Sequence, residues 1–480
     1  MITKTLPNGK TVTALPLTIP QQFMLGVSIQ YGKGFLINNI GSGYYFKADI
    51  DYDLLKQSVY EAIERCDTMR LRFIPDEQYK VLQYVEEKTE MEIGFLDYSA
   101  LSQQEADQRL LEYTRGDVPM FFTELHSIAL VKLPDGMGGI VMKIHHLAMD
   151  AYSVKIFLKD IMEIYLHKVK GTPYPKPMRP YLPEAMKELA FINSPKHEAE
   201  RKYWYESLAN NPEPIFTDYL LDNRMAKQRQ QYPDRRYCDI HSGSPEAGLI
   251  VFDMTAEETD KFMAMCKERD LSVCASLSMG IRTALSIFND NEQDVSFKMI
   301  INRRGTIGEK KSGGIRINTF PTRSIVSPDK KFTEAVDIIA QNQAEIYANC
   351  SIGFMEMLAL RHKSMPETAL ADSTYDSVGF SYQPLMIIPN IDEETAKSAR
   401  GIWYNNGASM IPVYITARHR ANDGGLQFVF EYRKTPDPEK DLHVFFDKIR
   451  LTLTMGTENP DITVGEILEK GALTQEERNV

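Results

Sequence analysis

The chain has 480 residues, of which 43% are apolar and 25% are charged. These values are those of an ordinary folded protein, and they exclude a disordered or a fibrous chain. The net charge of −11, from 55 basic and 66 acidic residues, disfavours a nucleic-acid role, because a phosphate backbone needs a positive surface. A chain of this length exceeds what one hydrophobic core usually serves, so we expect two core-forming units.

The first half of the chain alternates predicted helices and strands. Residues 51–66 carry apolar side chains at helical spacing. Two short apolar runs, at residues 125–133 and 139–146, flank the sequence PDGMG, and Asp-Gly between two such runs predicts a β-hairpin. Apolar residues then recur from residue 154 to residue 165 at the spacing of an amphipathic helix that faces a core.

Two segments interrupt this alternation. Five prolines lie between residues 171 and 183, and proline both fixes its own backbone angle and keeps its predecessor out of the helical region. We therefore expect the two units at residues 1–180 and 181–480. Residues 223–237 are polar and basic without an apolar period, so they are interpreted as an exposed loop or as a basic docking strip for an acidic partner.

The second half repeats the mixture of helices and strands. Thr255 and Glu258 have the spacing of a capping box for a helix that follows a strand. Apolar residues on one side predict a further helix from Ser272 to Phe288. The fold class expected from this pattern is α/β (α+β), with helices packed on sheets. The other predicted strands cover residues 248–254, 295–302 and 426–432, and the other predicted helices cover residues 332–350 and 439–453.

The sequence also predicts where the protein works. No apolar segment approaches the roughly 20 residues that a membrane-spanning helix requires. The N-terminal sequence MITKTLPNGKTVTALPLTIPQ contains no apolar core like that of a signal peptide. We therefore expect a cytoplasmic protein without membrane contact. The five cysteines are odd in number and lack Cys-x-x-Cys spacing, which favours reduced thiols over a disulfide framework or a metal site.

One segment has the residue types of a reactive site. The sequence HHLAMDA, residues 145–151, stands at the end of a predicted strand and just before the amphipathic helix. Histidine exchanges protons near neutral pH, so it can accept one from an amine or hydroxyl nucleophile. Adjacent strand residues point to opposite faces, so one histidine would face a cleft while the other faces the core. The same pattern also fits a histidine pair that only forms hydrogen bonds within a packed turn.

The HHLAMDA segment resembles the HHxxxDG motif of the condensation domains of nonribosomal peptide synthetases, which belong to a superfamily similar to chloramphenicol acetyltransferase. Ala151 replaces the glycine of the motif, so the turn must avoid positive φ there. Five other segments resemble condensation-domain motifs in the same order, so the resemblance covers nearly the whole chain. These segments are LPLTIPQQFM (15–24), ERCDTMRLRF (64–73), EAERKYWYESLAN (198–210), INRRGTIGEKKSGGIRINTFPTR (301–323) and VGFSYQP (378–384).

The resemblance implies two chloramphenicol acetyltransferase-like lobes in a V-shaped pseudo-dimer with a central tunnel. It implies an acyltransferase that joins an acyl or aminoacyl group, held as a phosphopantetheine thioester on a carrier protein or coenzyme A, to an amine or hydroxyl acceptor. No permanently bound cofactor is expected, because the thioester is a co-substrate. No Gly-Gly-x-Ser attachment site is found, so we expect a free-standing protein whose carrier arrives in trans. We also expect this protein to be a monomer.

The resemblance also assigns roles to residues near the motif. His146 is the candidate catalytic base, or the group that positions the nucleophile. His145 is expected to face the core. Asp150 is expected to be structural and to pair with Arg70, with Arg72 as the second choice. Without the resemblance, Arg70 would be interpreted as an ordinary surface arginine.

Two further residues are assigned from the later segment. Arg304 is chosen as the counterpart of the family's Gly-Arg arginine, since INRRG offers two candidates. Asn318 is expected near the tunnel as a positioning residue, although it could simply bond to backbone groups in a turn. Two alternatives remain open for the function: a non-catalytic relative that recruits partners, and an epimerase-like relative that shares HHxxxD.

Docking of the donor is expected to need a local basic patch. Carrier proteins are generally acidic and this chain is acidic as well, so long-range attraction between them is absent on average. Two clusters of basic residues are candidates for the docking patch. They are Arg224, Lys227, Arg229, Arg235 and Arg236 in the first cluster, and Lys310, Lys311 and Arg316 in the second.

Overall fold

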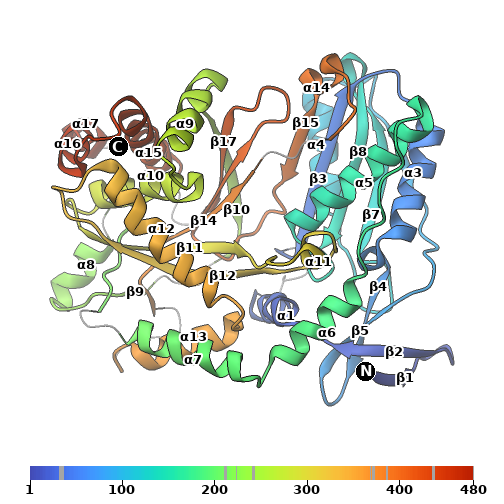
Figure 1. Ribbon diagram of the computed structural model, residues 1–480, viewed down its shortest axis with the longest axis horizontal. Coiled ribbons are helices and arrows are strands. Elements are labelled where there is room, and N and C mark those ends of the chain that lie inside the picture. Colours follow the sequence, from blue (N-terminus) through green and yellow to red (C-terminus); the bar gives the residue numbers. More distant parts are fainter. Residues whose placement is uncertain are drawn as a thin grey trace. The chain divides into compact units, whose positions relative to one another are not determined.

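The computed structural model describes residues 1–31, 37–209, 213–222, 224–239, 244–367, 369, 373–384, 388–434 and 438–478. Residues 210 and 223, at the ends of two segments named above, lie outside this part. The chain forms two compact units, which are coloured along the sequence in Figure 1. Unit 1 comprises Met1–His197, Asn302–Ile317 and Met386–Ala408. Unit 2 comprises Glu198–Ile301, Asn318–Leu385 and Ser409–Val480.

A five-stranded sheet forms the centre of unit 1, with its strands in the order β15, β3, β8, β7 and β6. Strands β7 and β8 are antiparallel neighbours, which confirms the hairpin predicted from PDGMG. Alternate residues of a strand point to opposite faces, and Tyr45, Val131 and Val141 share one face with helix α4. The bounds are β3 Asn39–Lys47, β6 Gly94–Asp97, β7 His126–Lys132, β8 Met137–His145, β15 Arg400–Tyr404 and α4 Gln103–Arg115.

Helices α3 (Tyr52–Arg65) and α5 (Ala151–Lys170) pack against each other in unit 1, and α3 also contacts β7. Asp51 caps α3 by accepting a hydrogen bond from the Leu54 backbone at 2.9 Å. Helix α3 confirms the helix predicted over residues 51–66. A second sheet has the strand order β1, β2, β5 and β4. The remaining elements of unit 1 are β1 Ile2–Thr5, β2 Thr11–Pro16, α1 Ile19–Tyr31, η1 Asp67–Arg70, β4 Leu71–Asp76, β5 Lys80–Val85, η2 Pro134–Gly136, α6 Tyr181–Phe191, α11 Ile307–Lys310 and α14 Glu393–Ser398.

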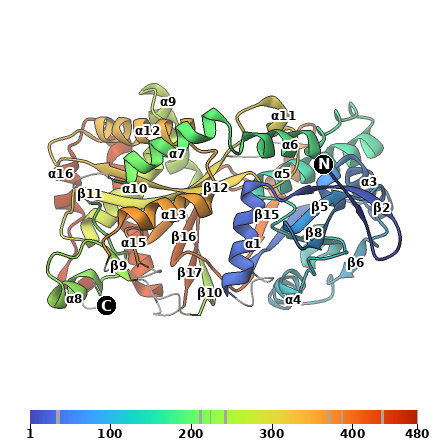
Figure 2. The same ribbon diagram turned by 90° about the horizontal axis from the view of Figure 1, so that it is seen from below.

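A six-stranded sheet forms the centre of unit 2, in the order β10, β17, β16, β14, β11 and β12. Helices α10, α12 and α15 bury their apolar faces against it in one continuous core, and α12 lies alongside β11 and β12 in Figures 1 and 2. The bounds are β10 Ala247–Asp253, β11 Asp294–Asn302, β12 Ile317–Ile325, β14 Val378–Gln383, β16 Val413–His419, β17 Leu426–Arg433, α10 Val273–Phe288, α12 Phe332–Ala348 and α15 Glu439–Glu458.

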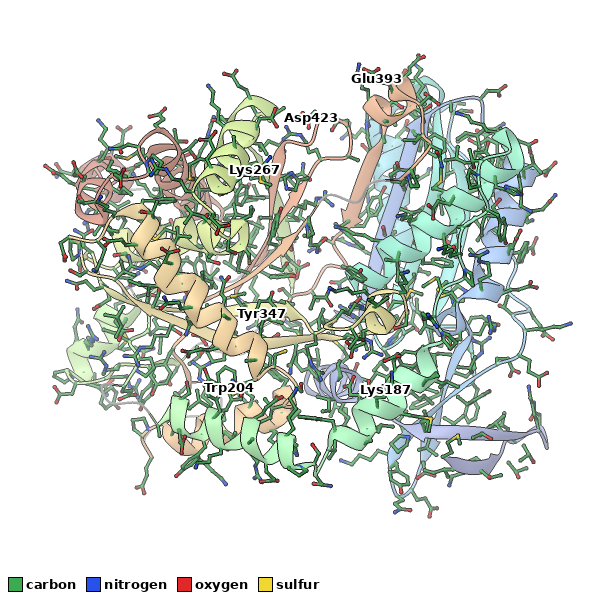
Figure 3. The ribbon with its side chains drawn as sticks, in the orientation of Figure 1. Lys187, Trp204, Lys267, Tyr347, Glu393 and Asp423 are labelled. Carbon is green, nitrogen blue, oxygen red and sulfur yellow. The ribbon has the colours of Figure 1, made fainter. Side chains whose placement is uncertain are left out.

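Local signals in the second half are confirmed. Thr255 and Glu258 form the predicted capping box at the start of α9 (Ala256–Glu268). Trp204, labelled in Figure 3, stacks on Phe320 with ring centroids 5.1 Å apart and donates its indole N–H to the Asn349 carbonyl. The remaining elements are α7 Pro195–Leu208, α8 Arg224–Gln231, β9 Cys238–Asp239, α13 Phe354–Ser364, β13 Ser373–Thr374, α16 Val464–Lys470 and α17 Gln475–Arg478.

The predicted boundary between residues 180 and 181 needs correction. Unit 1 continues to His197 and also takes in two later segments, one of which supplies β15 as a neighbour of β3. The proline-rich stretch does not leave unit 1, because Arg65 donates hydrogen bonds to the carbonyls of Pro175 and Lys176. The Asp67 carboxylate also accepts a hydrogen bond from the Tyr181 backbone at 2.6 Å. The proline-rich segment, residues 171–183, is therefore a connection held against unit 1 and not a boundary between the two units.

The interpretation of residues 223–237 as a loop is wrong for its first part, because Arg224–Gln231 form helix α8. The sequence of this helix has no regular spacing of apolar residues from which it could be predicted. Within the described residues, no single helix is long and apolar enough to cross a membrane, although α9 and α10, bent by 115° at their junction, meet the length and composition criteria as a pair.

Gly139 is a position in β8 where a side chain cannot fit. Its φ is +155°, and a Cβ atom would lie 2.1 Å from the Tyr44 carbonyl oxygen of the neighbouring strand. We predict that Gly139→Ala lowers the free energy of unfolding by more than about 2 kcal/mol, because backbone cannot move aside cheaply. Gly401, in β15, is the matched control, because a Cβ there meets nothing within 4 Å. Equal melting temperatures for Gly139→Ala and Gly401→Ala would contradict this packing.

Candidate active site

The HHLAMDA segment forms the junction between β8 and α5. Strand β8 ends at His145, and helix α5 begins at Ala151. Asp150 is the N-cap of the helix, since its side chain accepts a hydrogen bond from the Ser153 backbone at 2.9 Å. Ala151 lies in the first turn of the helix and is not among the positive-φ residues, so the turn needs no glycine there. The predicted strand-to-helix presentation of the motif is confirmed.

His145 is fully buried. Its backbone N–H donates to the Leu125 carbonyl at 2.7 Å, and its Nδ1 atom accepts a hydrogen bond from the Leu147 backbone at 3.1 Å. Burial lowers the pKa of His145 to about 3, and the neighbouring His146 acts in the same direction. His145 is therefore a neutral side chain that shapes the turn from inside the core.

His146 is the more exposed of the two histidines. Its backbone N–H donates to the Asn38 carbonyl at 2.6 Å, which fixes the residue at the end of the strand. Its Nδ1 atom is buried and has no hydrogen-bond partner within the described residues. Burial lowers the pKa of His146, and the negative charge of Asp150 opposes this shift. The neutral imidazole, which can accept a proton, is therefore the prevailing form at neutral pH.

Asp150 is buried and fully bonded. Its carboxylate accepts hydrogen bonds from both terminal nitrogens of Arg304, at 2.8 and 3.1 Å, and from the Arg316 backbone N–H at 2.8 Å. The Ser153 backbone supplies the fourth donor. Burial alone would raise the pKa of Asp150, but Arg304 and the two backbone donors hold it below its ordinary value. The ionised carboxylate thus anchors the turn that contains His146.

Arg304 extends this anchor into the segment Asn302–Ile317. Its side chain is 1% exposed, and Nη2 also donates to the Ser153 hydroxyl at 2.7 Å and to the Gly314 carbonyl at 2.8 Å. The guanidinium lies over the Tyr152 ring, 4.6 Å from its centroid. One arginine therefore joins the start of α5 to a loop far away in the sequence.

The predicted pairing of Asp150 with Arg70 is wrong, and so is the second choice, Arg72. Arg70 is the last residue of the 3-10 helix η1, and its guanidinium donates hydrogen bonds to backbone carbonyl groups. Arg72 binds the Leu71 carbonyl and the Glu124 carboxylate, the latter at 2.6 Å. Arg304, which had been selected only as a motif counterpart, is the partner of Asp150. The carbonyl groups bound by Arg70 belong to Ile63, Glu64 and Glu86.

Asn318 belongs to unit 2, whereas His146 belongs to unit 1. The Asn318 side chain donates to the Ile352 carbonyl at 2.6 Å and accepts a hydrogen bond from the Thr319 backbone at 2.9 Å. Both ends of its amide are thus bonded to backbone groups, as the simpler interpretation of this residue expects. Within the part of the chain that is described, no group of three or more acidic, histidine or cysteine side chains could hold a metal ion.

A buried pair of glutamines also supports the turn, and sequence reasoning did not single it out. Gln21 and Gln83 exchange hydrogen bonds between their amide groups at 2.8 and 2.7 Å. Gln21 also donates to the Leu147 carbonyl at 3.1 Å, next to His146. Thr18 donates its backbone and hydroxyl groups to Gln21. The Thr-x-x-Gln spacing in the LPLTIPQQFM segment was the signal that could have identified this contact.

The family model for the condensation domain matches residues 14–476. A plipastatin synthase protein of Bacillus subtilis (strain 168) is 22% identical over 411 residues, which cover 83% of this chain and 15% of that protein. Surfactin synthase subunit 1 of the same strain is 21% identical over 469 residues, which cover 95% of this chain and 12% of that protein. The chain therefore spans only a small part of the length of either relative.

Solved structures show the same fold. The first condensation domain of the calcium-dependent antibiotic synthetase, in complex with a substrate analogue, matches with a TM-score of 0.76 at 16% identity, over 95% of this chain and 98% of that chain. The starter condensation domain of a rhizomide synthetase variant, in complex with C8-CoA and Leu-SNAC, matches with a TM-score of 0.72 at 16% identity, over 94% and 96% of the two chains. The predicted mixed α/β, chloramphenicol acetyltransferase-like fold class is confirmed.

A double-mutant cycle distinguishes the two candidate partners of Asp150. Breaking a buried ion pair costs about 3–5 kcal/mol, because the remaining charge is left buried. We predict that Asp150→Asn and Arg304→Met are strongly non-additive in the free energy of unfolding, with a coupling of more than about 1 kcal/mol. Asp150→Asn and Arg70→Met should be additive within about 0.5 kcal/mol, since these side chains share no contact. Coupling to Arg70 instead of Arg304 would overturn this part of the site.

Proposed function

The chain belongs to the condensation domain family, and from this premise we propose that it joins a thioester-bound acyl or aminoacyl group to an amine acceptor, with His146 as the base or positioning group. The observation that carries the proposal is the intact His145-His146-x-x-x-Asp150 constellation within a family match that spans residues 14–476. The donor is held on the phosphopantetheine arm of a carrier protein or of coenzyme A. The bond formed with an amine is an amide, and a hydroxyl acceptor, which the assay below also tests, would give an ester.

The reaction exchanges one bond for another. The acceptor nitrogen attacks the thioester carbonyl carbon, so a C–N bond forms and the C–S bond breaks. The proton lost by the nitrogen passes to the imidazole of His146, and the departing sulfur leaves as a thiolate that takes up a proton. Because Nδ1 of His146 is buried, Nε2 is the ring nitrogen assigned to this proton.

The lowered pKa of His146 supports this role, because the imidazole must be neutral before it can accept a proton. A free α-amine has a pKa near 8, so a fraction of it is already unprotonated at neutral pH. A hydroxyl keeps its proton under the same conditions and depends more strongly on a base, whose contribution is roughly 10²–10⁴-fold. The size of the His146→Ala effect therefore reports the acceptor type.

The test is a direct assay of product formation. The protein is incubated with one acyl group presented as a carrier-bound, a coenzyme A and a small-molecule thioester, together with a panel of amines and alcohols, and the products are identified by mass spectrometry. Amide products that depend on His146 are expected. Absence of product with every combination would favour a partner-recruiting protein, and inversion of an α-carbon without condensation would favour an epimerase-like relative. Either result contradicts the proposal.

We predict that His146→Ala reduces transfer to an alcohol by at least about 10²-fold and transfer to an amine by less, while the melting temperature stays nearly unchanged. His145→Ala should instead lower the melting temperature, because it removes a fully buried ring and leaves the Leu147 N–H without its acceptor. Rates at saturating substrate and thermal unfolding of both variants provide the comparison. An unchanged rate for His146→Ala would remove it from the role of base.

The ion pairs of the two basic clusters show which basic residues are available to dock a carrier protein. In the first cluster, Arg224 and Arg235 form ion pairs with carboxylates, and so do Lys227 and Arg236. In the second cluster, Arg316 is buried beside Glu188. These pairings leave little free positive charge on the first cluster, and they remove Arg316 from the second.

Lys310 and Lys311 remain as the better candidates for carrier docking. Both are exposed at the end of α11, and within the described residues neither forms an ion pair. Arg179 lies beside them, because its backbone donates to the Lys311 carbonyl at 2.8 Å. Ile307, one turn earlier, is 70% exposed. The exposed Ile307 beside Lys310, Lys311 and Arg179 forms a surface that suits an acidic partner. This surface is close in the sequence to Arg304, which binds Asp150 at the active-site turn.

If a carrier protein is the donor, transfer should slow as ionic strength rises, because surface charges are screened over about 10 Å at 0.1 M salt. We predict that Lys310→Glu combined with Lys311→Glu raises the apparent KM for the carrier-bound donor several-fold but not for the coenzyme A thioester of the same acyl group. Lys227→Glu is the matched control, since its ammonium group pairs with Asp222. Equal use of both donors without salt dependence would exclude a docking surface.

A further inference from the structure

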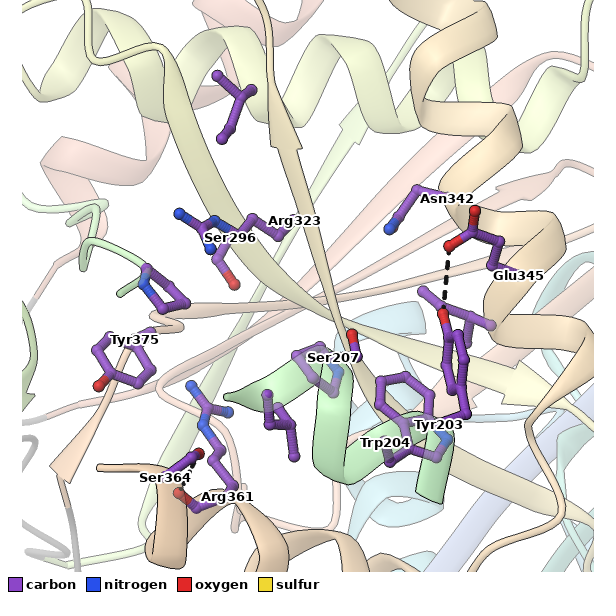
Figure 4. A pocket seen from close by; sticks show the side chains of 15 residues that line it. Tyr203, Trp204, Ser207, Ser296, Arg323, Asn342, Glu345, Arg361, Ser364 and Tyr375 are labelled. Atoms are coloured by element: carbon purple, nitrogen blue, oxygen red, sulfur yellow. Dashed lines mark hydrogen bonds between the residues drawn. The ribbon is translucent and has the colours of Figure 1, made fainter. Parts of the chain in front are cut away.

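Unit 2 contains a cavity of about 430 Å³ that is separate from the residues around His146. It lies between helices α7, α12 and α13 and the strands β11 and β12 at one edge of the six-stranded sheet (Figure 4). All of its lining residues belong to unit 2. The volume falls in the range of about 300–1,000 Å³ that is usual for small-molecule sites. The chemistry of its walls indicates what it could bind.

Two arginines line the cavity, and each is fixed by an ion pair with an aspartate. Arg323 donates Nε and Nη2 to the Asp294 carboxylate at 2.7 and 2.6 Å. Arg361 donates Nη1 to the Asp376 carboxylate at 2.5 Å. Within the described residues, Nη1 of Arg323 and both Nε and Nη2 of Arg361 have no hydrogen-bond partner. These N–H groups are the polar groups that the two guanidinium planes offer to a ligand.

The carboxylates behind the arginines are unable to serve a ligand. Asp376 is almost fully buried and also accepts a hydrogen bond from Ser296, and Asp294 is shared between Arg323 and Arg236. Burial alone would raise the pKa of Asp376, but Arg361 and Lys298 hold it below its ordinary value. The acceptors are therefore ionised and occupied, while the donors remain available at this end of the cavity.

The rest of the polar lining consists of an amide, a single carboxylate and hydroxyl groups, the last including those of Ser207, Ser364 and Tyr375. Asn342 accepts a hydrogen bond from the Thr322 hydroxyl at 2.6 Å, so its NH₂ group is left for the cavity. Glu345, beside Asn342 on α12 in Figure 4, accepts a hydrogen bond from the Tyr203 hydroxyl at 3.3 Å. Both of these side chains lie on the other side of the cavity from the two arginines, so the lining carboxylate does not compete for the guanidinium groups. A guanidinium fork is the group best suited to bind a carboxylate or phosphate.

The other walls are apolar. Trp204 uses its only polar atom on the Asn349 carbonyl, so it presents hydrocarbon to the cavity. Leu208, Pro321 and Ile346 add aliphatic surface from α7, β12 and α12. A ligand that filled the cavity would therefore need an apolar or aromatic body joined to its anionic group.

We propose that this cavity binds a small molecule that has a carboxylate or a phosphate monoester on an apolar or aromatic body. Arg323 and Arg361 hold the oxyanion, and Trp204 packs against the apolar part. This site is additional to the condensation chemistry, and its occupancy does not require a carrier protein or a thioester.

The two tryptophans of the chain make binding measurable. Trp204 lines the cavity in unit 2, whereas Trp403 lies in unit 1, so Trp403→Phe leaves a single fluorescent reporter at the site. The probes are benzoate, phenyl phosphate, inorganic phosphate and the neutral analogue benzamide. We expect a saturable change in Trp204 fluorescence with benzoate or phenyl phosphate, at least tenfold weaker binding of inorganic phosphate, and none with benzamide. A preference for benzoate or for phenyl phosphate identifies the natural oxyanion.

Variants assign the contact. Arg323→Lys and Arg361→Lys keep the charge beside Asp294 and Asp376 but remove the forked donors, and each should weaken binding at least tenfold. Arg450→Lys is the matched control, because Arg450 pairs with Glu258 elsewhere in unit 2. Melting temperatures measured in parallel identify folded variants. No saturable signal, equal binding of benzamide, or equal affinities for Arg323→Lys, Arg361→Lys and Arg450→Lys would overturn the proposal.

Discussion

The turn that follows β8 depends on one buried ion pair, between Asp150 and Arg304. Neither side chain is more than 1% exposed, and the carboxylate takes four hydrogen bonds from three residues. A pair of this kind does not have to stabilise the fold relative to an apolar substitute, but breaking it leaves a buried charge. The pair also fixes the start of α5 against the loop that contains Gly314. The position of His146 follows from this arrangement, since only three residues lie between it and Asp150.

Charge and reactivity are divided between neighbouring residues. The ionised groups, Asp150 and Arg304, are locked inside unit 1, while both histidines are kept neutral by burial. Gln21 reaches the same turn from the N-terminal part of the chain. Burial keeps the imidazole of His146 neutral in the resting protein. The nearby Asp150 carboxylate raises the pKa of His146, so it stabilises the ring once the ring has accepted a proton. This division suits a base that must receive a proton and return it.

Unit 2 uses arginine and aspartate differently. Arg323 and Arg361 also pair with buried carboxylates, but both line a cavity and their side chains are 18% and 10% exposed, whereas the Arg304 side chain is 1% exposed. The same pair of residue types therefore gives a structural anchor in one unit and an open donor surface in the other. Exposure of the guanidinium edge, and not the presence of the ion pair, separates the two cases.

Local spacing predicted what is local. The strand-to-helix junction, the capping box of Thr255 and Glu258 and the buried His145 all depend on residues a few positions apart, where spacing determines geometry. The partner of Asp150 lies 154 residues away, and several arginines compete for it, so no spacing could identify Arg304. The unit boundary failed for the same reason, because β15 returns to β3 from late in the chain. Helix α8 was missed because its charged residues carry no apolar period.

The central claim is that the ion pair holds the turn that presents His146, and hydrogen exchange measures this directly. Amide exchange of residues 145–153 is followed by mass spectrometry in the wild-type protein, in Arg304→Met and in His146→Ala. The account predicts much faster exchange of this segment in Arg304→Met, because the Asp150 carboxylate and the start of α5 lose their anchor, and wild-type exchange in His146→Ala. Wild-type protection of residues 145–153 in folded Arg304→Met would contradict it.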